Sequence, residues 1–193
     1  MLNSRLRASI GFGVIALLLS TCGGCRKQAG SNPNSSSPAN KTLPKTAPAS
    51  AYGWTQADNQ RMTLANYKGK VVLLDFYATW CEPCRAETPQ LVKLQQQYAG
   101  QGLQVIGLNV GGEDDRAEVP AYAKEFNIEY PLGFPEDEFA DEYLGDNQNI
   151  PQAFLFDRSG KLVKRFVGYS EDSGAEIDSV IQSLLIEPPI DKK

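Results

Sequence analysis

The stretch 70–94 limits the possible folds of this chain more than any other part of it. Its apolar run at 71–74 indicates a strand that is buried on both faces of a sheet. A Cys-x-x-Cys pair, Cys81 and Cys84, follows shortly after. The next residues place apolar side chains three or four positions apart, which predicts an amphipathic helix over 85–97. The sequence therefore predicts a strand that leads through a cysteine pair directly into a helix.

A cysteine pair at the start of a helix suits redox chemistry. Backbone N–H groups in the first turn lack intrahelical partners and carry about half a positive charge, so we expect Cys81 to form the attacking thiolate. Cys84 is close enough in sequence to close a disulfide with Cys81. Pro83 is compatible with the first turn, where the N–H group that proline lacks would have no partner. We expect Glu82 to be exposed and to moderate the effect of the helix on the thiolate.

The segment FYATWCEPC, which ends at Cys84, resembles the active-site segment of the thioredoxin superfamily. Its Trp-Cys-Glu-Pro-Cys form is most similar to membrane-tethered, extracytoplasmic thiol–disulfide oxidoreductases of the TlpA/ResA type. The resemblance implies an α/β protein with the thioredoxin-like fold, in which helices flank a central mixed β-sheet. It also implies an enzyme that acts on protein disulfides or dithiols and needs no cofactor beyond the redox-active disulfide Cys81–Cys84. Trp80 is expected to pack over this disulfide and to contact partners.

A zinc site is the alternative function of the cysteines. Cys22 and Cys25 form a second Cys-x-x-Cys pair, and four cysteines suit Zn²⁺ by ligand number. The first pair, however, lies at the end of a targeting segment, and nothing between the two pairs resembles a zinc ribbon. We therefore predict a redox pair at Cys81 and Cys84 and no metal.

Composition excludes several classes of function. A chain of 193 residues with 41% hydrophobic content can form one domain with a substantial core, plus appendages. The net charge of −4 argues against a nucleic-acid partner, which would need a basic face. The chain contains no histidine, which excludes imidazole as a general base, a metal ligand or a pH switch. Proton transfer must therefore rely on carboxylates, lysines, cysteines or water.

Residues 1–25 predict a targeting signal. A segment with two arginines precedes an apolar run at 10–19, which is shorter than the roughly 20 residues that span a bilayer. The following Leu-Ser-Thr-Cys resembles a bacterial lipobox and makes Cys22 the predicted lipidation site, although the family prefers Gly, Ala or Ser at Thr21. Cys25 fits less well. An uncleaved anchor and a secreted protein are the alternatives, and we expect a bacterial extracytoplasmic protein, in the periplasm or at the cell surface, anchored to the membrane.

The rest of the chain divides into a tether, one folded domain and a tail. Residues 26–50 contain four prolines and hardly any large apolar side chain, which predicts a disordered tether. We place the thioredoxin-like domain at 51–187 and a C-terminal tail at 188–193. The family resemblance implies a strand or hairpin ahead of the core and a central insertion of the TlpA type over 112–145.

The elements of the domain follow the hydrophobic periodicity. Further strands are expected at 103–110, within 128–134, at 154–156 and at 162–167, and further helices at 118–126, 137–144 and 173–186. The strand at 71–76, the first helix and the strand at 103–110 form a βαβ unit, so these two strands should be parallel. A turn at 157–160 predicts a hairpin. Residues 111–115 are expected to form a loop.

Two carboxylates near the cysteine pair are candidates for proton transfer. Asp75 follows the apolar strand, where burial would raise its pKa. By resemblance to thioredoxin-like proteins it is the predicted base for Cys84, although TlpA/ResA-type sequences often carry a neutral residue there. The alternative is an acid at the strand end with its carboxylate in water. Glu87 lies one helical turn after Cys84, where ResA-like proteins carry an acid; an ordinary solvent-facing acid is its alternative.

Ile150 and Pro151 lie just before the strand expected at 154–156. Thioredoxin-like folds place a cis-proline opposite the Cys-x-x-Cys pair, and by this resemblance Pro151 is that residue. The backbone of Ile150 would then pair with an incoming polypeptide, although the family frequently has Thr or Val before the proline. A trans proline in a turn is the alternative.

The resemblance also implies a mechanism. Cys81 attacks a client disulfide, Cys84 resolves the mixed disulfide, and Asp75 handles the proton. The expected direction is reductive, with electrons from a membrane thiol donor. Cytochrome c maturation is a role that the family suggests, with no sequence evidence for that client. The alternatives are a thiol oxidant or isomerase, a thiol peroxidase, and a non-enzymatic tethered binding module whose cysteines form a structural disulfide.

Overall fold

The computed structural model describes residues 52–186 of the chain. The predicted targeting segment, the tether, Cys22, Cys25 and the C-terminal tail lie outside the described residues. Within 52–186, none of the helices combines the length and the apolar character needed to cross a membrane.

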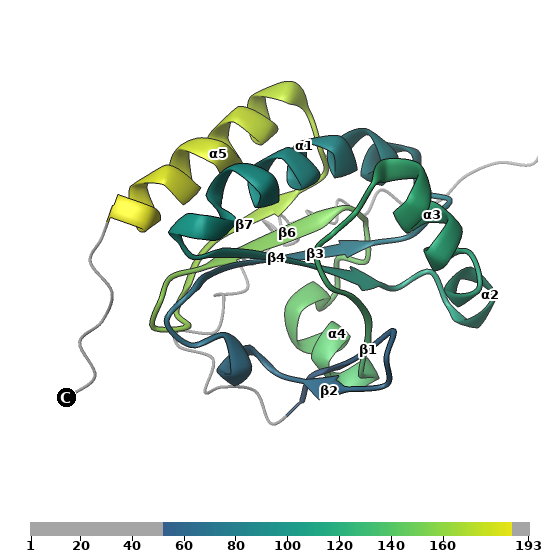
Figure 1. Ribbon diagram of the computed structural model, residues 1–193. Coiled ribbons are helices and arrows are strands. Elements are labelled where there is room, and N and C mark those ends of the chain that lie inside the picture. Colours follow the sequence, from purple (N-terminus) through teal and green to yellow (C-terminus); the bar gives the residue numbers. More distant parts are fainter. Residues whose placement is uncertain (1–51, 187–193) are drawn as a thin grey trace, which may run out of the picture. The chain divides into compact units, whose positions relative to one another are not determined.

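A seven-stranded mixed sheet forms the centre of the domain, with the strand order β2-β1-β5-β4-β3-β6-β7 (Figure 1). The strands are β1 (Trp54–Gln56), β2 (Arg61–Met62), β3 (Val71–Tyr77), β4 (Leu103–Asn109), β5 (Leu132–Pro135), β6 (Gln152–Phe156) and β7 (Leu162–Val167). Strand β4 runs parallel to both β3 and β5, and the other neighbouring strands are antiparallel. The predicted βαβ unit, the hairpin ahead of the core and the β6–β7 hairpin are therefore confirmed.

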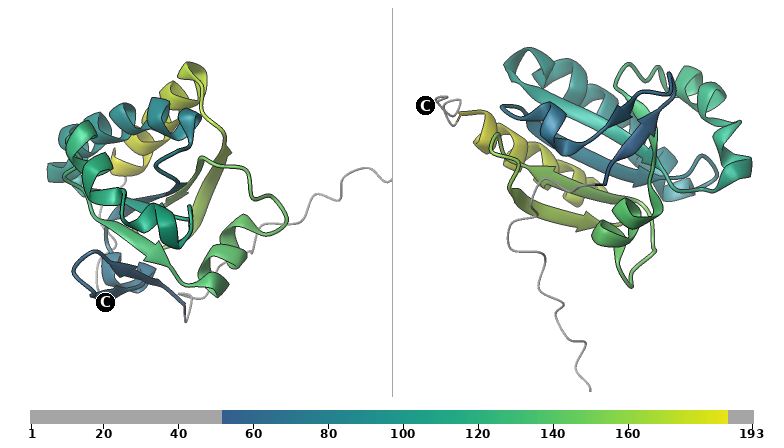
Figure 2. Two further views of the ribbon diagram at one scale, coloured as in Figure 1. Left: turned by 90° about the vertical axis from the view of Figure 1, so that its right-hand side faces the viewer. Right: turned by 90° about the horizontal axis from the view of Figure 1, so that it is seen from below.

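The helices cover both faces of this sheet. They are η1 (Leu64–Tyr67), α1 (Glu82–Tyr98), η2 (Ala99–Gln101), α2 (Glu113–Arg116), α3 (Val119–Phe126), α4 (Asp137–Leu144) and α5 (Glu171–Ile186), where η denotes a 3₁₀-helix. Helices α1 and α5 lie on one face, whereas α4 and η1 lie on the other, next to the β1–β2 hairpin (Figure 1, Figure 2). The predicted helices at 85–97, 118–126, 137–144 and 173–186 correspond to α1, α3, α4 and α5.

Strand β3 divides the core in two. Alternate residues of a strand project to opposite faces of its sheet, and every residue of β3 is buried. Val71 and Leu73 pack with apolar side chains of α1 and α5. Val72, Leu74 and Phe76 pack on the other face, with side chains of α4, η1 and the hairpin. Asp75 is an even number of positions from Val71 and Leu73, so its side chain projects to the same face of the sheet, toward α1.

Trp54 joins the hairpin to the core. Its side chain is fully buried, and the ring centroids of Tyr67 and Phe139 lie 5.9 and 5.6 Å from its own. Phe139 of α4 also stacks against Phe76 of β3 at 6.4 Å. The central insertion, which contributes α2, α3, β5 and α4, is therefore packed directly onto the central strand.

The structure corrects one prediction of secondary structure. Residues 111–115 are not simply a loop, because they contain most of the short helix α2. Its first turn carries three acidic residues, which suit a helix N-terminus, and Asp115 is buried. Gly111 leaves the space for this carboxylate, since a Cβ atom at Gly111 would lie 2.1 Å from Asp115 Oδ2. Contacts from other elements to Asp115 hold this turn in place, and a local sequence pattern cannot show such contacts.

Candidate active site

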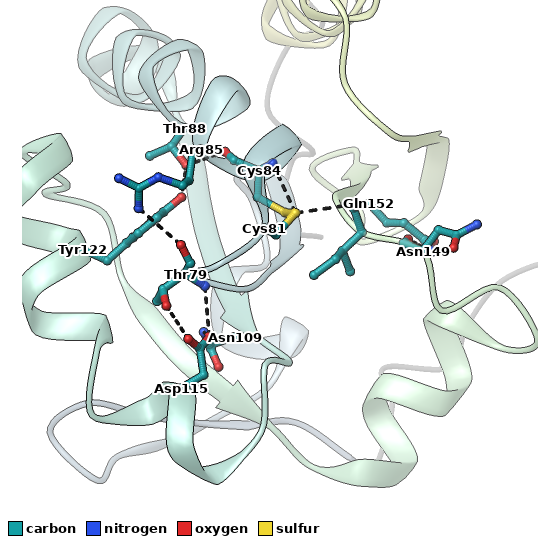
Figure 3. The surroundings of a disulfide bond; sticks show 11 residues. Thr79, Cys81, Cys84, Arg85, Thr88, Asn109, Asp115, Tyr122, Asn149 and Gln152 are labelled. Carbon is teal, nitrogen blue, oxygen red and sulfur yellow. Dashed lines mark hydrogen bonds between the residues drawn. A yellow bond between two sulfur atoms is a disulfide. The ribbon is translucent and has the colours of Figure 1, made fainter. Parts of the chain in front are cut away.

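Cys81 and Cys84 form a disulfide at the start of α1 (Figure 3). Cys81 is the N-cap of the helix, and its sulfur accepts a hydrogen bond from the backbone N–H of Cys84 at 3.3 Å. Pro83 lies in the first turn, as predicted, and both Glu82 and Pro83 are exposed. The Cys84 N–H, which has no partner within the helix, therefore points at the Cys81 sulfur, and together with the helix dipole it favours the Cys81 thiolate once the disulfide is reduced.

The disulfide occupies both sulfurs that a zinc site would need as thiolates. Among residues 52–186, no group of three or more potential ligands of the His, Cys, Asp and Glu types is placed to hold a metal ion. The second cysteine pair lies outside the described residues.

The peptide bond between Ile150 and Pro151 is cis, as predicted. The carbonyl oxygen of Ile150 lies 3.8 Å from the sulfur of Cys81, and the Pro151 carbonyl accepts a hydrogen bond from the Gly168 N–H at 2.8 Å. Pro151 is buried and Ile150 is half-buried. The segment before β6 therefore lies against the disulfide at the start of α1.

Trp80 directly precedes the disulfide, and 66% of its surface is exposed. It was expected to pack over the disulfide, but most of the side chain faces solvent. A large exposed aromatic side chain next to a reactive sulfur offers an apolar contact area. Its contact with partners stays a prediction.

Asp75 is buried in the centre of the sheet, with 3% of its surface exposed. Its register partners, Gly107 of β4 and Ala153 of β6, are small. Its Oδ1 atom has no hydrogen-bond partner among the described residues. Burial raises the pKa of Asp75 from its ordinary value of 3.8 to about 7. The alternative of a carboxylate in water is therefore wrong, and Asp75 can exchange a proton near neutral pH.

Glu87 lies on the side of α1 that faces the sheet, on the same stripe as Cys84 and Leu91. Only 2% of its surface is exposed, and its Oε2 atom lacks a hydrogen-bond partner within 52–186. Burial, and in second place the charge of Asp75, raises the pKa of Glu87 well above its ordinary value. The solvent-facing alternative is therefore wrong, and burial favours the protonated form of Glu87.

Three buried tyrosines border the two carboxyls. Burial raises the pKa of Tyr122 to about 12 and raises the pKa values of Tyr77 and Tyr130 further above their ordinary range. The charge of Asp75 contributes to all three shifts. These phenols stay protonated at neutral pH, so Asp75, with its pKa of about 7, is the group of this cluster that titrates there.

Asp115 anchors the loop before the disulfide, a role that sequence analysis missed. Its carboxylate accepts hydrogen bonds from the Thr79 backbone N–H at 2.9 Å, from the Thr79 hydroxyl, and from Asn109 Nδ2 at 2.6 Å (Figure 3). Burial alone would raise the pKa of Asp115, but these hydrogen bonds outweigh it and lower the pKa below its ordinary value. An ionised carboxylate of the insertion therefore holds Thr79, two residues before Cys81.

Arg85 also holds the loop that contains Thr79, through the Thr79 carbonyl, and sequence analysis did not identify this role. Its Nη1 atom donates to the Thr79 carbonyl at 3.2 Å, and its Nη2 atom forms an ion pair with Glu125. The guanidinium carbon lies 5.7 Å from the ring centroid of Tyr122 and 5.1 Å from that of Phe126. Helix α3 thus supports the active-site helix and its preceding loop.

Two relatives with an assigned activity are similar to this chain in sequence. Thiol–disulfide oxidoreductase ResA of Bacillus subtilis is 32% identical over 117 residues, which cover 60% of this chain and 63% of the relative. The protein of the same name from Geobacillus thermodenitrificans is 32% identical over 121 residues, which cover 61% of this chain and 67% of the relative. The chain thus spans less than two thirds of the Bacillus subtilis relative.

Solved structures give the same fold. A thiol:disulfide interchange protein of the thioredoxin family from Chlorobium tepidum has a TM-score of 0.61 and 29% identity, over 69% of this chain and 93% of that one. StoA from Bacillus subtilis has a TM-score of 0.51 and 20% identity, over 65% and 92%, and supports the fold alone. The domain therefore has the thioredoxin-like fold. Residues 44–165, more than half of the sequence, match the AhpC/TSA family, and the chain belongs to that family.

Proposed function

We propose that this protein is a membrane-tethered, extracytoplasmic thiol–disulfide oxidoreductase that reduces disulfides of client proteins by dithiol exchange. The observation that carries the proposal is the Cys81–Cys84 disulfide at the N-terminus of α1, which faces the cis bond before Pro151. The relatives named thiol–disulfide oxidoreductase support the same class of reaction.

The exchange takes place in two steps. In the reduced protein the Cys81 thiolate attacks one client sulfur, so that a Cys81–client disulfide forms, the client disulfide breaks and its other sulfur leaves as a thiolate. The Cys84 thiolate then attacks the Cys81 sulfur, closes the disulfide and releases the second client thiolate. The client gains two electrons from the cysteine pair. Its two thiolates take up two protons, one that Cys84 gives up through Asp75 and one from solvent, which replaces the proton that Cys81 had already lost as a thiolate. A dithiol protein in the membrane reduces the pair for the next cycle.

The buried carboxyls manage the proton of the resolving cysteine. Asp75 accepts the proton of Cys84, and its pKa of about 7 allows it to do so near neutral pH. The raised pKa of Glu87 limits the negative charge of the buried region, because it disfavours ionising both carboxyls together. This limit matters because a thiolate forms nearby in the same step and a second buried charge would oppose it.

The N-terminal sequence supports a position outside the cytoplasm. The lipobox-like segment makes Cys22 the candidate for a lipid anchor, and the proline-containing segment 26–50 would hold the domain away from the membrane. Trp80 and the backbone of Ile150 are the proposed contacts for a client polypeptide. The client that the family resemblance suggests is an apocytochrome c, whose cysteines must be thiols before haem is attached.

The reduction potential of the cysteine pair tests the direction of the reaction. The full-length chain is equilibrated in thiol–disulfide buffers of defined potential, its free thiols are alkylated, and it is digested with trypsin. Cleavage after Lys70 and Arg85 releases peptide 71–85, which contains Cys81 and Cys84 and no other cysteine. A potential near the thioredoxin value of about −270 mV supports a reductant. A potential near about −120 mV supports an oxidant or isomerase and contradicts the cytochrome role.

Other measurements separate the remaining alternatives. Consumption of hydrogen peroxide without a protein disulfide would support a thiol peroxidase. Resistance of Cys81 to alkylation after mild reduction would support a binding module with a structural disulfide. In the proposed mechanism the Cys84→Ser variant accumulates a mixed disulfide with the client, whereas the matched Cys81→Ser variant does not.

A further inference from the structure

A fully buried amide, Gln152, follows the cis-proline at the start of β6. Its Nε2 atom donates to the backbone carbonyls of Asn147 and Asn149, each at 2.7 Å. Its Oε1 atom accepts from two nitrogens of Arg165 on β7, with Nε at 2.9 Å. A carboxamide has two N–H donors and an oxygen with two lone pairs, so every hydrogen-bonding position of the side chain is in use.

Arg165 determines which way this amide points. A guanidinium group only donates hydrogen bonds, so the Gln152 oxygen must face Arg165 and the NH₂ group must face the segment before Pro151. Arg165 is itself held, because its guanidinium carbon lies 5.4 Å from the ring centroid of Phe154. The strand β7 therefore supports the segment before the cis bond through a single oriented side chain.

The two carbonyls held by Gln152 belong to the segment that faces the disulfide. Asn149 directly precedes Ile150, whose carbonyl oxygen lies 3.8 Å from the Cys81 sulfur. Figure 3 shows Asn149 and Gln152 together on one side of the disulfide. On the other side of Ile150, the Pro151 carbonyl accepts a hydrogen bond from the N–H of Gly168, which directly follows β7. The Ile150 backbone is therefore fixed from both ends.

We propose that Gln152 is a positioning residue for protein clients, which sets the backbone of Ile150 against Cys81 by holding the carbonyls of Asn147 and Asn149. The inference rests on the proposed function, because it concerns how a client polypeptide meets the attacking sulfur. A small disulfide needs only the Cys81 sulfur, whereas a polypeptide must also pair with the Ile150 backbone. Loss of the Gln152 hydrogen bonds should therefore slow the reaction of protein disulfides selectively.

The test compares two substrates in single turnovers of the reduced full-length chain. Insulin serves as the protein disulfide, and 5,5′-dithiobis(2-nitrobenzoic acid) serves as the small one. In Gln152→Met, which keeps the length of the side chain without its hydrogen bonds, we expect the insulin rate constant to fall about tenfold and that of the small disulfide to change less than about twofold. A general loss of stability would slow both reactions alike and would lower the melting temperature without changing the ratio of the rates.

A matched control and a second variant complete the design. Gln95 also uses its side chain to hold a backbone group, the Val105 N–H at 2.7 Å, but lies about 16 Å along α1 from Cys84. Gln95→Met should leave the ratio of the two rates unchanged. Arg165→Met should lower the insulin rate selectively, and its effect combined with Gln152→Met should be less than the product of the single effects.

If Gln152→Met folds and the ratio of the insulin rate to the small-disulfide rate is unchanged, the inference is overturned. If Gln152→Met does not fold, an unchanged ratio in Arg165→Met overturns it. A failure of the proposed function would instead appear in the unsubstituted chain, which would then reduce neither substrate.

Discussion

Asp75 of β3 and Glu87 of α1 form a pair of buried carboxyls between sheet and helix, in which the charge of Asp75 adds to the effect of burial and raises the pKa of Glu87. Each side chain has an oxygen without a hydrogen-bond partner among residues 52–186. Ionising both groups is less favourable than ionising one, because both are buried and their charges repel. Asp75, with its pKa of about 7, is the member of the pair that exchanges a proton near neutral pH, as the proposed proton acceptor for Cys84 must.

The first prediction concerns the pH dependence of the reaction. Asp75 is ionised above its pKa of about 7, so it can accept a proton there and not at lower pH. We expect Asp75→Asn to slow insulin reduction by about tenfold or more at pH values above this pKa and to have little effect well below it. Single-turnover rates between about pH 5 and pH 9 provide the measurement. A profile identical to that of the unsubstituted chain would contradict the role of Asp75.

The second prediction concerns the stability of the fold. The pKa of Asp75 is raised in the folded state, so its contribution to stability is fully present below its ordinary value of 3.8 and is lost as the pH rises through about 7. Asp75→Asn removes this loss and should make the protein more stable above neutral pH, by up to about 4 kcal/mol, with a smaller difference at acidic pH. Denaturant unfolding at both pH values measures the difference.

Asp141 offers the control for both experiments. It lies on α4 with an exposed side chain, so Asp141→Asn makes the same chemical change away from the buried pair. A similar gain of stability in Asp141→Asn would show that removal of a negative charge anywhere, rather than relief of a buried one, causes the effect.

The third prediction tests the anchor of the active-site loop. Asp115→Asn weakens the hydrogen bonds to Thr79, so we expect it to destabilise the fold by about 1–3 kcal/mol at neutral pH. The pKa of Asp115 is lowered in the folded state, so this stabilisation is present above its ordinary pKa of 3.8 and is lost as the pH falls through the lowered value. The difference between variant and unsubstituted chain should therefore shrink in strong acid.

Glu113→Gln is the matched variant on the same helix, because the Glu113 side chain is 86% exposed. It should change stability by less than about 0.5 kcal/mol. Equal losses in Glu113→Gln and Asp115→Asn would mean that the charge of the α2 N-terminus, and not the anchor, stabilises this region.

The fourth prediction concerns the hairpin ahead of the core. A Cβ atom at Gly53 would lie 2.0 Å from the backbone oxygen of Met62, so Gly53→Ala should cost about 1–3 kcal/mol. A Cβ atom at Gly100 would meet nothing within 4 Å, so Gly100→Ala should leave stability unchanged or raise it slightly. Thermal unfolding compares the two variants. Since Trp54 of the hairpin packs on the face of the sheet opposite the apolar side chains of α1, the reduction potential of folded Gly53→Ala should stay the same. A shifted potential would show that the hairpin influences the site.

The elements that carry the cysteine pair could be predicted because their signals are local. The apolar run of β3, the three-and-four spacing of α1 and the N-terminal position of Cys81 are all properties of neighbouring residues. The cis bond could be predicted because only X–Pro bonds adopt this geometry readily, and the family resemblance named Pro151. The burial of Glu87 had a usable signal as well. Extending the apolar stripe of α1 back from Leu91 passes through Glu87.

The sequence by itself thus determined the strand–cysteine–helix unit, the position of the proline and the candidate proton acceptor. Only the tertiary structure decided that Glu87 and Asp75 come close enough to influence each other, and that Asp115 and Gln152 hold the two segments around the disulfide. Periodicity and capping act between residues a few positions apart, whereas Asp115 meets Thr79 across 36 positions and Gln152 meets Arg165 across two paired strands. Such contacts exist only after the sheet order and the helix packing have brought distant residues together.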